Sequence, residues 1–248
     1  MRDRAPGTAV MEQVVRLQDA SPRRSALARA LGRHPLSGDA RPWFSGALGE
    51  REVGALLTRL PQGWSAFHAV PVGSGDADVD HLVVGPGGVF VINTKHHRGA
   101  RLTVYARSVL VDGVKKPYLR NSDLEASRVR GLLLRAGIEI PVEPVIVVVG
   151  AKEVRTRQKP ARAAVLRSEG LVRWLSRRPS RVDAATVARA TGLFDDPATW
   201  RPVDPSADTV ERFGAIEREV RSARLVRFGW GAAGALGTVA VALPMLPR

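Results

Sequence analysis

The feature that most constrains the fold of this chain is a pair of apolar runs joined by a short glycine-rich segment. The first run covers residues 79–84, the second covers residues 89–92, and Gly85-Pro86-Gly87-Gly88 separates them. Short β-branched runs on either side of glycine and proline predict two buried strands joined by a tight turn. Because hairpin strands run in opposite directions, the start of the first strand should lie beside the end of the second.

Polar side chains stand at these two adjacent strand ends. Asp78 and Asp80 begin the first strand, and Asn93 and Lys95 end the second. Side chains two residues apart point to the same face of a strand, so each pair should share one surface. Carboxylate and amide oxygens can hold Mg²⁺, and an ammonium group can stabilise an attacking hydroxide. This combination is what metal-dependent phosphodiester cleavage requires, and Glu50 on the preceding segment could add another ligand.

The remaining segments predict an α/β fold with a mixed sheet. Apolar residues at helical spacing predict a helix from residue 48 to Pro61 and a second helix over residues 121–136, capped by Asn121-Ser122-Asp123. The β-branched run at 142–149 predicts a central strand that is covered on both faces. Helices before, between and after a group of strands indicate a sheet flanked by helices.

The motifs resemble the NERD, or nuclease-related domain, family. The resemblance extends from Ser45 to Gly150 and rests on Gly49-Glu50-x-x-Val53-Gly54, Leu60-Pro61 and the continuous stretch from Asp78 to Lys95. That family is grouped with the PD-(D/E)xK nucleases. The resemblance therefore implies a restriction-endonuclease-like mixed sheet flanked by helices, here with a helical C-terminal extension, and magnesium-dependent hydrolysis of DNA.

The resemblance also implies roles for individual residues. Asp80 corresponds to the motif aspartate, Lys95 to the motif lysine, and Glu50 to the acidic residue of the leading helix. We therefore expect Asp80, Lys95 and Glu50 to be catalytic. We expect Asp80, Asn93 and Glu50 to be the ligands of Mg²⁺ or Mn²⁺.

Asn93 departs from the general nuclease pattern, which has Asp or Glu two residues before the lysine. An amide offers a neutral carbonyl oxygen in place of a negative charge, so we expect weak metal binding. Three explanations remain open. Glu50, Asp78 and Asp80 replace the missing charge, or Glu125 reaches in from the later helix, or the protein binds nucleic acid without cutting it.

The charge balance favours a polyanionic partner. The chain has 38 Lys and Arg against 24 Asp and Glu, a formal net charge of +14, which suits nucleic acid or an anionic membrane surface. An arginine-rich composition is the alternative explanation. The chain has no cysteine, which fits a cytoplasmic protein and excludes thiolate metal sites. We expect contacts to nucleic acid, DNA first, from six basic residues in two loops: Lys115, Lys116, Arg120, Arg155, Arg157 and Lys159.

The chain divides into four predicted segments. They are a poorly ordered leader with one short helix (1–42), the NERD-like nuclease domain (43–195), a helical connector (196–227) and an apolar tail (228–248). The tail approaches the length of a membrane span, and the arginines before it would keep that side in the cytoplasm. It predicts either a helix that tethers the protein to the inner face of the membrane, or a tail that packs on the domain or self-associates.

Overall fold

The computed structural model describes residues 4–22, 24–72, 78–200 and 208–242, with side chains as far as residue 232. The chain forms two compact units. The sheet unit comprises Met1–Val10 and Ser45–Pro205, and the helical unit comprises Met11–Phe44 and Ser206–Arg248. The two units are described separately below.

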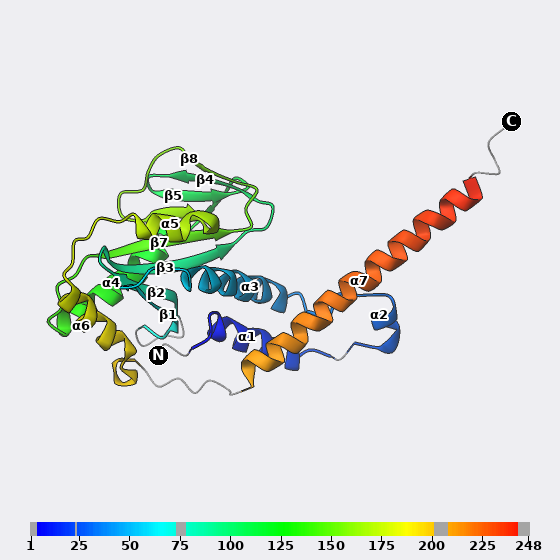
Figure 1. The fold of residues 1–248 in the computed structure, drawn as a ribbon. Coiled ribbons are helices and arrows are strands. Elements are labelled where there is room, and N and C mark those ends of the chain that lie inside the picture. The colour runs from blue at the N-terminus through cyan, green and yellow to red at the C-terminus, as the bar shows by residue number, and fades with distance from the viewer. Residues whose placement is uncertain (1–3, 23, 73–77, 201–207, 243–248) are drawn as a thin grey trace. The chain divides into compact units, whose positions relative to one another are not determined.

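A five-stranded mixed sheet forms the centre of the sheet unit (Figure 1). The hairpin strands β2 and β3 pair antiparallel, with Gly85 opposite Gly88 at the turn, as predicted. Gly88 has a φ of +122°, a conformation that favours glycine. The β-branched run forms β7, which lies inside the sheet and parallel to β3. The strand order is β1 (Ser65–Val70), β2 (Val79–Gly85), β3 (Gly88–His96), β7 (Val142–Val149) and β9 (Ala164–Arg167).

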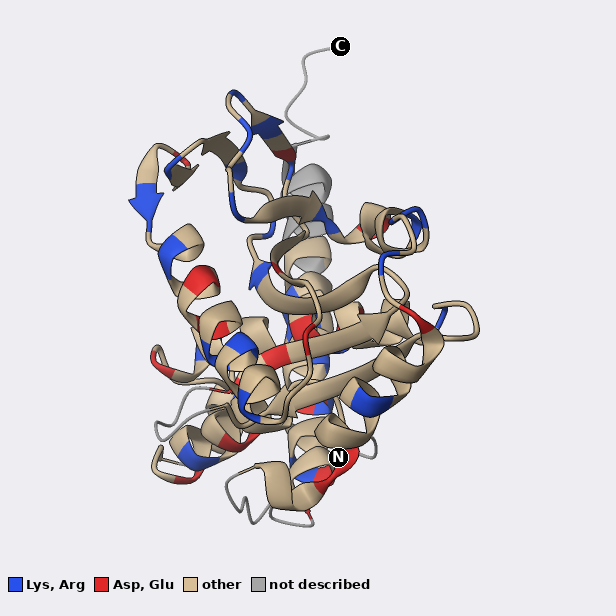
Figure 2. Cartoon of the chain, turned by 90° about the vertical axis from the view of Figure 1, so that its left-hand side faces the viewer, with Lys and Arg blue, Asp and Glu red and all other residues tan. Residues whose placement is uncertain are grey.

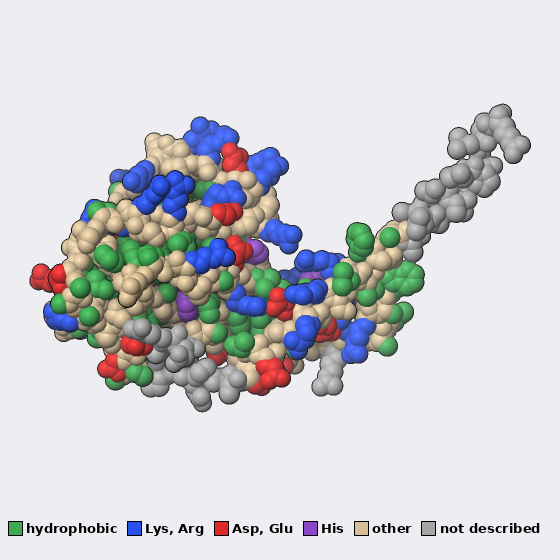
Figure 3. Space-filling model, viewed as in Figure 1, with side chains coloured by type: hydrophobic (Ala, Val, Ile, Leu, Met, Phe, Trp, Pro, Cys, Tyr) green, Lys and Arg blue, Asp and Glu red, His purple; other side chains and the backbone are tan. Residues whose placement is uncertain are grey.

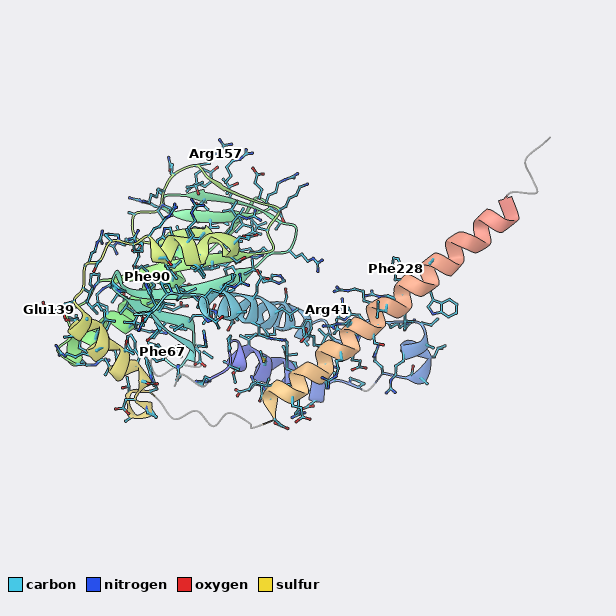
Figure 4. The ribbon with its side chains drawn as sticks, in the orientation of Figure 1. Arg41, Phe67, Phe90, Glu139, Arg157 and Phe228 are labelled. Carbon is cyan, nitrogen blue, oxygen red and sulfur yellow. The ribbon has the colours of Figure 1, made fainter. Side chains whose placement is uncertain are left out.

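Helices cover both faces of this sheet, which confirms the predicted α/β class. One face packs on α4 (Tyr118–Arg135) and α6 (Ala184–Asp195), and the other packs on α3 (Ala40–Leu57) and α5 (Leu171–Ser176). Figure 4 labels two aromatic residues of the sheet, Phe67 of β1 and Phe90 of β3, which belong to the cores on its opposite faces. Phe67 meets Phe194 of α6 edge to face at 6.0 Å, and Phe90 meets Trp174 of α5 at 5.6 Å. Both faces of the central strands are therefore shielded from water.

A smaller sheet packs against strand β7 of the larger one. Its strand order is β6 (Val114–Lys116), β5 (Ser108–Val111), β4 (Arg101–Tyr105) and β8 (Glu153–Thr156). Buried Leu102 and Val104 of β4 share a core with Ile146 and Val148 of β7. This core connects the two sheets of the unit.

The predicted cap of α4 is wrong. The helix begins at Tyr118, directly after Pro117, and the Asn121 backbone N–H donates to the Pro117 carbonyl at 3.0 Å. Ser122 is fully buried inside the helix, where it cannot act as a cap. Asn121, Ser122 and Asp123 therefore lie inside α4, because the helix begins before them.

The helical unit contains α2 (Ala26–Ala30), α7 (Thr209–Ala242) and residues 11–19 of α1 (Thr8–Asp19). Arg212 of α7 donates to Asp19 at 2.6 Å, and Phe44 stacks on Phe213 with ring centroids 5.2 Å apart. Helix α2 confirms the predicted short helix. The expected poorly ordered leader also includes α1, because Met11, Val14 and Val15 recur at helical spacing and are buried.

Helix α7 runs through residues predicted to be a connector and on into the predicted apolar tail. Residues 243–248 of that tail lie outside the described residues. Within the part of the chain that the structure describes, no helix combines the length and apolar character needed to cross a membrane.

Gly49 allows α3 to approach β3 closely. A Cβ atom at Gly49 would lie 2.9 Å from the Cβ of His96, which is attached directly to the backbone and cannot swing away. We predict that Gly49→Ala lowers the free energy of unfolding by about 1–3 kcal/mol, measured by chemical denaturation.

Gly46→Ala in the same helix is the matched control. A Cβ there would lie 3.5 Å from the Cγ1 of Val10, which is an ordinary contact. Better helix propensity should leave this variant as stable as the wild type, or more stable by up to about 1 kcal/mol. Equal destabilisation of both variants would contradict a close approach specific to Gly49.

Candidate functional site

The hairpin brings Asp80 to the end of β3. The register pairs His81 with Ile92, so Asp80 stands opposite Asn93, just beyond the paired residues. The Thr94 backbone N–H donates to Asp80 Oδ2 at 2.5 Å. The carboxylate thus takes up a backbone donor where the strand pairing ends, and this bond fixes Asp80 beside the polar end of β3.

Asn93 connects the hairpin to α4. Its Nδ2 donates to Oε1 and Oε2 of Glu125, each at 2.8 Å. Its Oδ1 is buried and has no hydrogen-bond partner among the described residues. Glu125 therefore reaches the site from the later helix, which is one of the three explanations left open for Asn93. Asn93 also keeps a buried acceptor oxygen without a donor.

Glu50 reaches the same edge of the sheet from α3. It is only 6% exposed, and it interacts electrostatically with Asp80, Lys95 and Asp78. Burial raises the pKa of Glu50 well above its ordinary value, and repulsion from Asp80 raises that pKa further, whereas Lys95 lowers it. Gly49, the residue before Glu50, permits the helix approach that places it here.

The other two carboxyl groups respond to the same surroundings. Burial raises the pKa of Asp80, while Lys95 and the Thr94 N–H oppose that shift. Burial also raises the pKa of Glu125, and the hydrogen bond from Asn93 opposes it. Three carboxyl groups therefore share a poorly hydrated region in which their negative charges repel one another.

Lys95 lies over an aromatic ring that was not predicted to belong to the site. Its Nζ is 5.4 Å from the centroid of Tyr118, the first residue of α4. The Tyr118 hydroxyl is 2.7 Å from His97 Nε2, and the two rings stack with centroids 5.8 Å apart. The basic loop ending at Pro117-Tyr118 was the only sequence signal for this contact, and it indicated no particular partner.

Arg4 is a second neighbour that the sequence did not predict. Its guanidinium is 3.7 Å from Asp78, and its side chain is 12% exposed. No nitrogen of this guanidinium has a hydrogen-bond partner within the described ranges. Pro6, two residues later, occupies the space that a side chain at Gly54 would need. Arg4 precedes any periodic segment, so pattern analysis had no means of finding it.

The histidines of the sheet unit are structural neighbours of the site. His81 is fully buried, and its Nδ1 lies 2.8 Å from Nδ1 of His68. Burial lowers the pKa of His68 to about 4 and that of His81 well below its ordinary value, so both rings are neutral at pH 7. His96 contacts Ser45 Oγ through Nδ1 at 2.6 Å.

The six predicted nucleic-acid contacts do not form one cluster. Lys115 and Lys116 lie on β6, and Arg155 lies on β8, at the opposite edge of the smaller sheet. Arg155 also donates to Glu153 at 2.7 Å, which offsets part of its charge. Arg157 lies at the outer edge of this sheet (Figure 4). Figure 2 shows basic residues distributed over its strands and loops, and Arg120 and Lys159 are likewise exposed.

The site offers carboxylate and amide oxygens, which are the donors that a hard divalent cation prefers. Among the described residues, no group of three or more His, Asp or Glu side chains is placed to hold a metal ion. The oxygens that could hold one belong to the carboxyl groups of Asp80 and Glu50 and to the unpaired Oδ1 of Asn93. Mg²⁺ prefers such oxygen ligands, and it usually keeps several of its own waters, so few protein ligands are needed.

Comparison with known protein families adds an independent finding. The model of the NERD family, described as the nuclease-related domain, matches residues 45–149. This segment contains Glu50, Asp80, Asn93, Lys95 and Glu125. Neither the comparison with curated proteins nor that with solved structures produced a match. The resemblance seen in the motifs is confirmed, because residues 45–149 of this chain match the model of the nuclease-related domain.

Proposed function

We propose that the sheet unit is a metal-dependent nuclease that hydrolyses phosphodiester bonds of DNA. The observation that carries the proposal is the pairing of Asn93 with Glu125. The amide donates two hydrogen bonds to a carboxylate and keeps its own buried oxygen unpaired. Glu125, which accepts hydrogen bonds from Asn93, thus supplies the negative charge that Asp or Glu at position 93 would have carried.

Asp80, Glu50 and Asn93 Oδ1 would hold Mg²⁺ or Mn²⁺. When bound, the cation would stabilise negative charge on a phosphate and lower the pKa of a coordinated water. It would also relieve the repulsion among the buried carboxylates. Because Asn93 is neutral, we expect the affinity for the metal to be lower than it would be with three carboxylate ligands.

Lys95 would stabilise negative charge that develops during the reaction. Its ammonium group has three donors and lies close enough to Glu50 and Asp80 to influence the pKa of each. The Tyr118 ring lies beneath it and restricts where it can move. A cation held in place before the reaction needs little reorganisation, which is the basis of electrostatic catalysis.

The polyanionic substrate would be held mainly through its phosphates. Lys115, Lys116 and Arg120 on one side, and Arg155, Arg157 and Lys159 on the other, are exposed or partly exposed. Such contacts give an affinity that falls with salt and depends little on base sequence. They suit a nuclease that acts on the backbone without reading bases.

Lys95 should be required for cleavage. Purified protein should nick supercoiled DNA in the presence of Mg²⁺ or Mn²⁺, and Lys95→Ala should reduce the rate at least about 100-fold, since it removes the stabilising cation. Exposed Lys152→Ala serves as the charge-matched control and should leave the rate unchanged. Equal rates for the wild type and Lys95→Ala would mean that the cleavage does not arise at this site.

The stability of the metal-free protein should depend on the ionisation of Glu50. Because burial raises the pKa of Glu50, the folded state keeps its proton to a higher pH than the unfolded chain. Stability therefore falls as pH rises from the ordinary carboxyl pKa through the raised one, and below both values the penalty is absent. Glu50→Gln, which is neutral throughout, should stabilise metal-free protein by about 1–2 kcal/mol near pH 8 and have little effect near pH 4.

Thermal unfolding in EDTA and in excess Mg²⁺ measures this effect. Mg²⁺ should raise the Tm of the wild type near pH 8 and should raise that of Glu50→Gln much less, because a ligand is lost. An equal stability difference between the two proteins at both pH values would show that Glu50 carries no unfavourable charge.

A nucleic-acid-binding module without catalysis is the second candidate, and the neutral side chain of Asn93 favours it. This function requires salt-dependent DNA binding that survives both EDTA and Asp80→Ala, together with the absence of metal-stimulated cleavage. Binding that collapses without metal would exclude it. Measurements of DNA binding and of cleavage, with metal and with EDTA, therefore separate the two functions.

A further inference from the structure

The helical unit exposes large apolar side chains on α2 and α7. The exposed fractions are 77% for Phe228, 67% for Leu225 and 60% for Trp230 on α7, and 68% for Leu27 on α2. Leu31, directly after α2, is 46% exposed. Leu225 and Phe228 are three residues apart on one side of α7 and are called the apolar surface. Apolar side chains gathered in this way on the outside of a protein mark a contact site for a partner.

Specific contacts hold α2 against one side of α7. Gly32, which follows α2, has a φ of +63°, and a Cβ there would lie 2.8 Å from the Ala223 carbonyl oxygen of α7. Trp230 Nε1 donates to the Ala30 carbonyl at 2.8 Å. Ala223 and Trp230 therefore lie on the side of α7 that meets α2. Leu225 and Phe228 are each two residues away from one of them, so they lie on the opposite side of the helix.

Arginines accompany the apolar surface. Arg221, Arg224 and Arg227 lie on α7, and no Asp or Glu occurs between Val220 and Ala242. Arg221, Leu225 and Phe228 are spaced four and three residues apart, so they share one side of the helix. Figure 3 shows basic and hydrophobic side chains next to one another along α7, and Figure 4 shows Phe228 projecting outward from it.

We propose that the apolar surface and its arginines bind an anionic membrane surface, with α7 contacting the headgroup region. Aromatic and aliphatic side chains bordered by cations are suited to this region, because the rings enter the acyl boundary while arginines meet lipid phosphates. A second copy of the chain would bring arginines against arginines. Nucleic acid would satisfy the arginines and leave Leu225 and Phe228 in water.

Vesicle co-sedimentation of the full-length protein tests this proposal. The protein should bind vesicles containing phosphatidylglycerol more tightly than vesicles of phosphatidylcholine alone. The double variant Leu225→Ser/Phe228→Ser should weaken binding at least about tenfold, because it removes the exposed apolar area. Val114→Ser/Leu134→Ser is the matched control. It alters side chains that are each 58% exposed in the sheet unit, and it should leave vesicle binding unchanged.

Two results would overturn the proposal. One is vesicle binding that the double variant leaves unchanged and that salt abolishes, which would show charge attraction alone. The other is a wild-type dimer that the double variant converts to a monomer, since the apolar surface would then be covered by a second copy. Light scattering on the same samples reports the oligomeric state, and circular dichroism confirms that each variant is folded.

Discussion

The burial of three carboxyl groups in one region is the constraint on which the site depends. Glu50, Asp80 and Glu125 come from a helix, a strand and a second helix, and burial raises the pKa of each. Lys95 lowers that pKa in all three cases, and Asn93 donates to one of the three. A single ammonium group cannot neutralise three carboxylates, so this arrangement favours a further cation.

The apolar layers of the fold hold in place the helices and the strand that carry these carboxyl groups, despite the unfavourable electrostatic energy. Gly49 lets α3 lie against β3, and the Thr94 N–H secures Asp80 at the end of the strand pairing. The continuous parallel pairing of β3 with β7 keeps the strand end rigid. The penalty is consistent with a functional site, since groups that destabilise a fold are usually kept for what they bind or catalyse.

The sequence predicted the hairpin, β7 and the mixed sheet because alternation, glycine turns and β-branched runs are local signals. It could not choose the partner of Asn93, because Glu125 lies 32 residues away and only the packing of α4 on the sheet brings them together. The same limit applies to Tyr118 and Arg4, whose roles follow from neighbours distant in sequence. The cap of α4 was mispredicted because suitable capping residues occur within the helix itself.

The most direct test of the proposed metal site is a crystal soaked in Mn²⁺, whose anomalous scattering reveals the ion. One Mn²⁺ should lie at about 2 Å from an Asp80 oxygen and from Asn93 Oδ1, with Glu50 close by. Anomalous density should disappear in Asp80→Ala and persist in the Lys95→Ala crystal. A saturated crystal with no ion between Asp80 and Asn93 would contradict the proposed metal site.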